Sequence, residues 1–120
     1  MKKCPYGRNV LITGASSGIG LSSALLFARN GFTVYAISRH CTEEVENFDG
    51  GGRIIPIRCD VTDESSVKNA VSKIEDLNIV IHCAGFGISG SAECTPVDAA
   101  RAQMETNYIG VLNVNSFALP

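Results

Sequence analysis

The stretch VLITGASSGIG, residues 10–20, decides the fold of this chain. It begins with an apolar run typical of a buried strand and continues into a turn with Gly14, Gly18 and Gly20. Apolar residues then recur at helical spacing from Ile19 to Ala28, so the order is strand, turn, helix. Glycine lets the main chain approach a ligand closely, and the first turn of a helix offers free N–H groups. We therefore expect the turn to bind an anion, and a phosphate in particular.

Other sites also use a glycine-rich turn between a strand and a helix, including flavin sites, phosphate loops and tight turns that bind nothing. A Walker-type phosphate loop is disfavoured, because no Lys-Ser or Lys-Thr follows Gly20. The pattern Thr13-Gly-x-x-x-Gly18-x-Gly20 resembles the cofactor fingerprint of the short-chain dehydrogenases/reductases. The resemblance implies that the cofactor contacts Gly14, Ser16, Ser17, Gly18, Ile19 and Gly20.

Length and composition indicate one globular domain, spanning residues 1–120. Hydrophobic residues make up 45% of the chain, and a net charge of −2 offers no electrostatic reason to bind nucleic acid or an anionic membrane. The apolar run at residues 10–12 is too short for a signal peptide, so we expect a cytoplasmic protein. The five cysteines include no C-x-x-C pair, which predicts reduced, apolar fillers and neither disulfides nor a zinc site.

Strands and helices alternate along the chain, which predicts an α/β fold. We expect a Rossmann-like, doubly wound parallel sheet, truncated, with strand order 3-2-1-4 and helices on both faces. The predicted strands are 9–13, 33–38, 53–59 and 79–83, and the predicted helices are about 18–30, 62–77 and 95–115. Pro56 favours an edge position for the third strand. The acidic segment 41–48 is predicted to be a short exposed helix or a loop.

Local signals mark the helix ends. Gly31 and Asn78 suit the left-handed position that follows a helix. Thr62 is placed to cap the second predicted helix. A capping box with Thr95 and Asp98 is predicted to begin the last one, with a proline at its first position.

The residue after the second strand bears on the choice of cofactor. Ser38 stands where NAD-binding folds carry an acidic residue, and Arg39 follows it. A guanidinium group fits a phosphate, and no carboxylate is present to repel one, so NADP is favoured over NAD. The alternative is that Arg39 is an ordinary solvated side chain.

The resemblance extends to the ends of the third and fourth strands. Asp60-Val61 is similar to the family's Asp-Val pair, whose carboxylate accepts from the adenine amino group, although Asp60 suits a turn or an N-cap equally well. Residues 82–85 replace the family's Asn-Asn-Ala-Gly and keep Ala84 and Gly85. We expect His82 to be structural, with its ring donating to a backbone carbonyl, because no second metal ligand is evident.

On the last helix, Asn107-Tyr108-Ile109-Gly110 resembles the family's Asn-x-x-Gly. The resemblance implies that Asn107 binds a water molecule and takes part in a proton relay. An apolar stripe from Val97 to Leu112 predicts that Asn107 lies half-buried beside the core, although such a residue also often faces solvent. The family's catalytic serine and Tyr-x-x-x-Lys pair have no counterpart here, so we expect no efficient hydride transfer by these residues alone.

A fold with four strands leaves the fourth strand as an exposed apolar edge, and the last helix loses a neighbour for part of its apolar face. We therefore predict a homo-oligomer formed through that edge or through the last helix. The leading functional hypothesis is the NADP-binding part of an oxidoreductase acting on a carbonyl or an alcohol. The alternatives are a non-catalytic nucleotide-binding module that acts through dimerisation or as a sensor of redox state, and an interaction module that binds no nucleotide.

Overall fold

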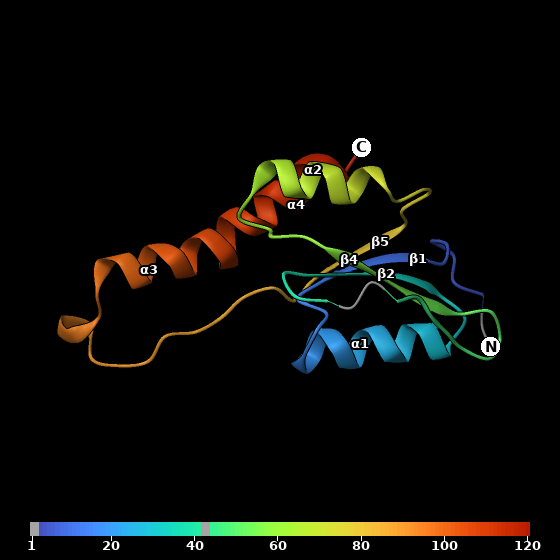
Figure 1. Cartoon of the computed structure of the whole chain (residues 1–120), viewed down its shortest axis with the longest axis horizontal. Coiled ribbons are helices and arrows are strands. Elements are labelled where there is room, and N and C mark those ends of the chain that lie inside the picture. Colours follow the sequence, from blue (N-terminus) through green and yellow to red (C-terminus); the bar gives the residue numbers. More distant parts are fainter. Residues whose placement is uncertain (1–2, 42–43) are drawn as a thin grey trace.

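The computed structural model describes residues 3–41 and 44–120, which form one sheet with helices on both faces (Figure 1). The strands lie in the order β3-β4-β2-β1-β5. Four of them are parallel, and they are β1 (Asn9–Thr13), β2 (Thr33–Ser38), β4 (Arg53–Arg58) and β5 (Ile79–His82). These are the four predicted strands, and their predicted order is confirmed.

The central strand β1 is apolar because both of its faces are covered. Val10, Leu11 and Ile12 are fully buried. Leu11 lies opposite Tyr35 of β2 on one side and opposite Val80 of β5 on the other. A side-chain period of two sends Val10 and Ile12 to one core cluster and Leu11 to the other.

Helices complete the two layers. The helix α1 (Gly18–Arg29) covers one face of the sheet through the buried Ala24 and Ala28, and ends before Gly31, whose φ of 86° is left-handed as predicted. The helices α2 (Glu64–Ser72) and α4 (Gly110–Ala118) pack on the other face. Val67 and Val114 anchor these two helices in the core, where both are fully buried.

The prediction of a helix or loop at residues 41–48 was wrong for part of that segment. The two-residue strand β3 (Glu46–Asn47) pairs antiparallel with Ile54 and Arg53, so the sheet is not wholly parallel. The N–H of Phe48 donates to the carbonyl of Gly52 at 2.8 Å and closes the hairpin. Residues 42 and 43 of the same prediction lie outside the described part of the chain.

The ends of α2 also differ from the prediction. Asp63, not Thr62, caps the helix, with its Oδ1 accepting from the N–H groups of Ser65 (3.0 Å) and Ser66 (3.3 Å). The helix ends at Ser72, and the left-handed residue that follows is Asp76, with φ of 50°. Asn78 instead accepts a hydrogen bond from the N–H of Asn9 at 3.0 Å.

The last predicted helix is continuous but irregular. It consists of α3 (Val97–Met104), a π-helical turn η2 (Glu105–Ile109) and α4. The predicted capping box does not form, because the Thr95 hydroxyl donates to the Ser91 carbonyl at 2.9 Å, and the proline lies one residue before the helix. A short 3-10 turn, η1 (Ala92–Cys94), precedes α3.

The apolar stripe on this helix is not the core contact that its spacing predicts. Four of its members are 44–66% exposed, namely Val97, Met104, Tyr108 and Leu112. Val97 and Met104 are exposed because α3 extends beyond the sheet and does not pack on it, which gives the molecule its 52 Å long axis (Figure 1). Within the described residues, no helix is long and apolar enough to cross a membrane.

Candidate functional site

A cleft of about 440 Å³ lies at the carboxyl ends of the parallel strands, and every residue predicted to bind the cofactor lines it. The turn after β1 contributes Gly14, Ser16, Ser17, Gly18, Ile19 and Gly20. The ends of the other strands contribute Arg39, Asp60, Val61, Ala84 and Gly85. Parallel strands that all end at one edge bring these distant segments together.

The glycine turn is built for a close approach of main chains. Gly14 and Gly18 have φ values of 63° and 56°, which disfavour residues with a side chain. A Cβ atom at Gly14 would lie 2.7 Å from the Ala84 nitrogen, and one at Gly20 would collide with the carbonyl oxygen of Gly14. The N–H of Ala15 donates to the Ile37 carbonyl at 3.1 Å, which fixes the turn to the end of β2.

The N-terminus of α1 faces this cleft without a side-chain cap. Ser17 occupies the N-cap position, but its hydroxyl makes no capping hydrogen bond, and the first turn holds no acidic residue. The first N–H groups of the helix and the positive end of its dipole are thus available to an external anion. Together with the space left by the glycines, this arrangement fits the pyrophosphate of a dinucleotide.

Thr13 links the glycine turn to the segment after β5, a role that the sequence analysis missed. Its Oγ1 accepts from the N–H groups of Cys83 and Ala84, both at 3.1 Å, and the residue is almost fully buried. The hydroxyl therefore holds the segment after β5 against the glycine turn. A threonine at the end of a strand, just before a glycine turn, is the signal that could have revealed it.

Arg39 and Asp60 lie at the same end of the cleft. The Asp60 Oδ1 accepts from the backbone N–H of Thr62 at 3.0 Å and from its hydroxyl at 2.7 Å. These two bonds, aided by the charge of Arg39, hold the pKa of Asp60 below its usual value. The turn role weighed for Asp60 is therefore present in the structure, and its contact with adenine stays a prediction. Burial raises the pKa of the Cys59 thiol, which also lines the cleft.

His82 has a different partner from the one predicted. Its Nε2 lies 2.9 Å from Oδ1 of Asn115 on α4, not from a backbone carbonyl. This pair links the edge strand β5 to the helix above it, as expected of a structural residue. Among the described residues, no cluster of three His, Cys, Asp or Glu side chains could hold a metal ion.

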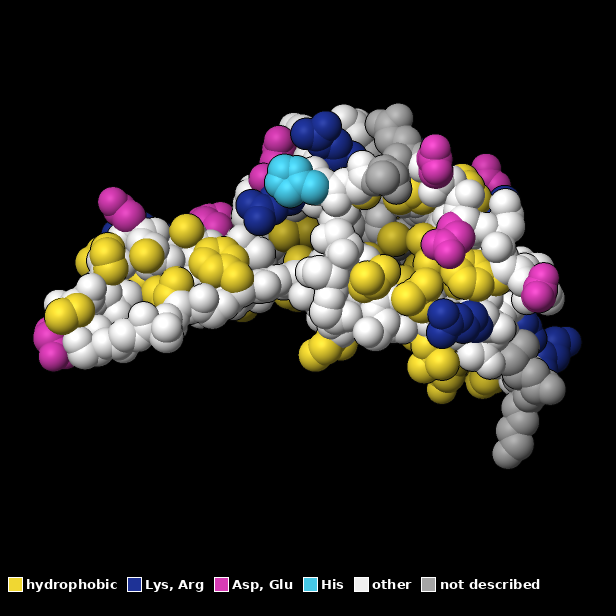
Figure 2. All heavy atoms as spheres, turned by 60° about the horizontal axis from the view of Figure 1, so that its bottom comes forward, with side chains coloured by type: hydrophobic (Ala, Val, Ile, Leu, Met, Phe, Trp, Pro, Cys, Tyr) yellow, Lys and Arg dark blue, Asp and Glu magenta, His cyan; other side chains and the backbone are white. Residues whose placement is uncertain are grey.

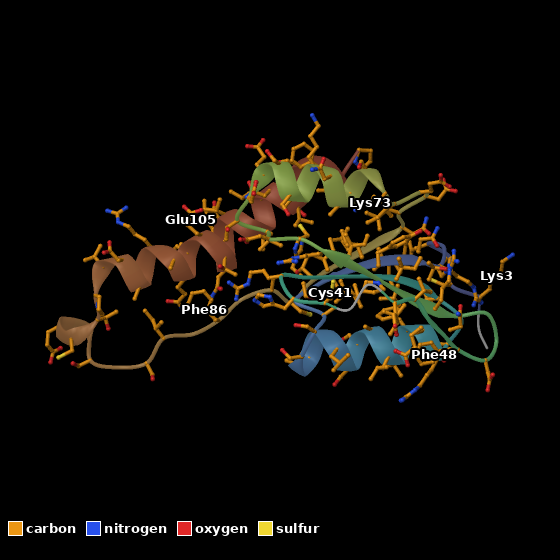
Figure 3. All side chains as sticks on the ribbon, viewed as in Figure 1. Lys3, Cys41, Phe48, Lys73, Phe86 and Glu105 are labelled. Atoms are coloured by element: carbon orange, nitrogen blue, oxygen red, sulfur yellow. The ribbon has the colours of Figure 1, made fainter. Side chains whose placement is uncertain are left out.

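Asn107 lies in the π-helical turn and is exposed, not half-buried as predicted. Its Oδ1 accepts from the N–H of Phe86 and its Nδ2 donates to the carbonyl of Phe86, both at 2.9 Å. Figure 3 labels Phe86 on the segment after β5, below the helix that carries Glu105. The Asn107 amide thus fixes the position of Phe86, which lines the cleft. The role of Asn107 in a proton relay stays a prediction. The neighbouring Thr106 lines the cleft, although the sequence analysis did not single it out.

Comparisons with known proteins identify the family of this chain. The family model described as short chain dehydrogenase matches residues 8–120. A probable short-chain type dehydrogenase/reductase of Helicobacter pylori is 36% identical over 114 residues, which cover 92% of this chain and 41% of the relative. A 3-ketodihydrosphingosine reductase of Bacteroides thetaiotaomicron is 36% identical over 115 residues, covering 92% of this chain and 40% of the relative.

Solved structures show the same fold. The ligand-free aldohexose dehydrogenase of Thermoplasma acidophilum has a TM-score of 0.81 at 28% identity, over 94% of this chain and 43% of that one. An NADH-dependent reductase complexed with NAD has a TM-score of 0.78 at 26% identity, over 95% of this chain and 52% of that one. The chain therefore spans only about half the length of these proteins or less. With a family model that matches all but its first seven residues, the chain belongs to the short-chain dehydrogenase family.

Proposed function

We propose that this chain binds NADP(H) in the cleft at the carboxyl ends of its strands, as the cofactor-binding part of an oxidoreductase that acts on a carbonyl or an alcohol. The observation that carries the proposal is the convergence of every predicted cofactor residue on one cleft. The cofactor would supply the hydride, and the residues of this chain would bind and orient it.

Each part of the cleft suits one part of the cofactor. The pyrophosphate would lie on the glycine turn, where N–H groups of α1 lack other acceptors within the helix. The adenine would lie beside Asp60 and Val61, and the nicotinamide toward Ala84 and Gly85, which also line the cleft. The clamp of Asn107 on Phe86 would keep the nicotinamide end of the cleft in place.

The preference for NADP rests on Arg39. Its side chain is exposed, lines the cleft and follows the buried Ser38, so no carboxylate stands at the end of β2. A 2′-phosphate would gain a guanidinium partner there and meet no like charge at that strand end. An NADH-dependent reductase is among the similar structures, so the preference for NADP is argued from Arg39 and not from the fold.

Calorimetric titration with NADPH and with NADH tests the proposal. We expect Arg39→Ala to weaken NADPH binding by roughly tenfold or more, as for the loss of a hydrogen bond to a charged group, and to leave NADH binding almost unchanged. Arg53→Ala is the matched control, because Arg53 is also exposed but begins β4, at the opposite end of the strand from the cleft. Equal binding of the two cofactors, or binding of neither, would contradict the proposal.

The residues that perform acid–base chemistry in the family are not among these 120. Tyr6, Tyr35 and Tyr108 are followed four residues later by Val10, Arg39 and Leu112, so no lysine is placed to lower the pKa of a tyrosine. We expect this stretch alone to bind the cofactor without reducing carbonyl substrates, which also suits a non-catalytic nucleotide-binding module. Turnover of NADPH with a carbonyl substrate would contradict this expectation.

We also propose that the chain self-associates. In the sheet of the described residues, β5 pairs only with β1 and leaves an apolar edge. Hydrophobic side chains also gather on the projecting part of the molecule (Figure 2). Met104 on α3 and Leu112 on α4 are both exposed. We expect sedimentation velocity at micromolar concentration to show oligomers, and Met104→Lys with Leu112→Lys to reduce them if the helix is the contact. A single monomeric species of the unaltered chain would refute self-association.

A further inference from the structure

Three asparagines on the last helix each hydrogen-bond a segment that borders the cleft. The helix runs from α3, which projects beyond the sheet, through η2 to α4, which packs beside α2 on one face of the sheet (Figure 1). The three contacts join Asn107 to Phe86, Asn113 to Val61, and Asn115 to His82, over 2.8–2.9 Å. The middle contact reaches the part of the cleft predicted to bind adenine.

Asn113 acts on one peptide group of that wall. Its Nδ2 donates to the Val61 carbonyl oxygen at 2.8 Å. The N–H of Thr62, in the same planar peptide group, points the opposite way and donates to Oδ1 of Asp60 at 3.0 Å. The peptide group is thus held at both ends, by an amide on the helix and by the carboxylate in the cleft.

The packing around Val61 reinforces this hold. A Cβ atom added at Gly110, one helical turn before Asn113, would lie 2.7 Å from the Val61 Cγ2. The helix backbone therefore approaches Val61 as closely as a residue without a side chain allows, and Val61 is only 6% exposed. With its side chain against Gly110 and its carbonyl on Asn113, Val61 has little freedom to move.

The same peptide group determines which oxygen of the Asp60 carboxylate is free to accept a hydrogen bond from a ligand. Both hydrogen bonds that the described residues give to the Asp60 carboxylate go to Oδ1, one from the Thr62 N–H and one from its hydroxyl. Oδ2 is thereby left as the acceptor for a donor in the cleft. A rotation of the Val61–Thr62 peptide group would withdraw the N–H and leave the carboxylate held by the Thr62 hydroxyl alone.

We propose that Asn113 is a positioning residue of the cofactor site, which holds the Val61–Thr62 peptide group so that the Asp60 carboxylate presents Oδ2 to the adenine amino group. The proposal rests on the proposed function, since it assigns Asn113 a part in recognising the base of the dinucleotide. Its consequence is selectivity for a base that carries an amino donor over one that does not.

The first experiment compares NADPH with reduced nicotinamide hypoxanthine dinucleotide phosphate, in which a carbonyl replaces the adenine amino group. A hydrogen bond from the amino group to a charged acceptor predicts that the unaltered chain prefers NADPH by roughly tenfold or more. Asn113→Leu should bring the two affinities close to each other. Asn115→Leu is the matched control, because Asn115 lies on the same helix and bonds His82 instead of Val61.

We expect Asn115→Leu to lower stability but to keep the preference for NADPH. A preference that survives in Asn113→Leu, or that falls equally in both variants, would overturn the proposal. Where Asn113→Leu does not fold, Asn113→Ser takes its place, because the hydroxyl is too short to reach the Val61 carbonyl and adds no bulk.

The second experiment needs no cofactor. The Thr62 N–H is the largest cause that lowers the pKa of Asp60, so Asn113→Leu should raise that pKa toward its ordinary value, measured by carboxyl-carbon NMR titration. The charge of Arg39, which also lowers the pKa, is unaltered in the variant. An unchanged pKa would overturn the positioning role. If the unaltered chain binds neither dinucleotide, the proposed function fails, and this titration still decides whether Asn113 positions Asp60.

Discussion

Replacing Gly14 with alanine should lower the free energy of unfolding more than replacing Gly18. Both residues have a left-handed φ, 63° and 56°, which costs a side-chain-bearing residue about 1–2 kcal/mol. A Cβ at Gly14 also stands 2.7 Å from the main chain of Ala84, whereas one at Gly18 meets nothing within 4 Å. Overpacking adds about 1–3 kcal/mol. We expect a total loss of about 2–5 kcal/mol for Gly14→Ala.

Urea unfolding followed by circular dichroism measures this difference, since the slope of the transition should stay the same in both variants. Alanine restricts the unfolded chain equally at either position, so that effect cancels in the comparison. Two variants that agree to within about 0.5 kcal/mol would refute the close approach of the glycine turn to the segment after β5.

Three further predictions concern the packing of helix α4 and the stability of the protein at acid pH. Gly110→Ala places a Cβ 2.7 Å from the Val61 side chain, and this overpacking, about 1–3 kcal/mol, should outweigh the gain of about 1 kcal/mol from the helix propensity of alanine. A raised urea midpoint would contradict this. His82→Ala and Asn115→Ala should show a coupling energy of about 0.5–1.5 kcal/mol in a double-mutant cycle, and strict additivity would disprove the bond. The pKa of Asp60 is lower in the folded protein than its ordinary value of 3.8. The carboxylate therefore stabilises the folded state above pH 3.8, and this stabilisation is lost as pH falls through the folded pKa. Thr62→Val should make unfolding less sensitive to pH in that range, and an identical pH profile would argue against this hydroxyl as a cause.

The sheet and the cleft could be predicted from the sequence because their signals are local. The apolar run before Gly14 and the crossover helix after it dictate a parallel arrangement, and the strand ends then meet at one edge. The residues that line the cleft follow directly from that topology. The short strand β3 gave no such signal, because Glu46 and Asn47 are polar and pair only through the hairpin that Gly52 closes.

Other features depend on contacts that spacing does not reveal. Thr62 and Asp63 are both suitable caps, and the choice falls to Asp63 because Thr62 is engaged by Asp60. The apolar residues of the last helix recur at helical spacing whether or not another element packs against them, so the spacing alone does not show that they are buried. Asn113 lies 52 residues from its partner Val61, so only the folded chain shows that this polar residue has a specific acceptor.

The cleft draws on segments from Gly14 to Thr106, so no smaller piece of the chain contains it. A dinucleotide that occupies it would favour the folded form over every partly folded one, by about 2.7 kcal/mol at a hundredfold excess over Kd. Resistance to proteolysis would then rise with the supply of dinucleotide. The dinucleotide would stabilise the folded chain, so the rate at which proteases degrade the protein would depend on the dinucleotide concentration.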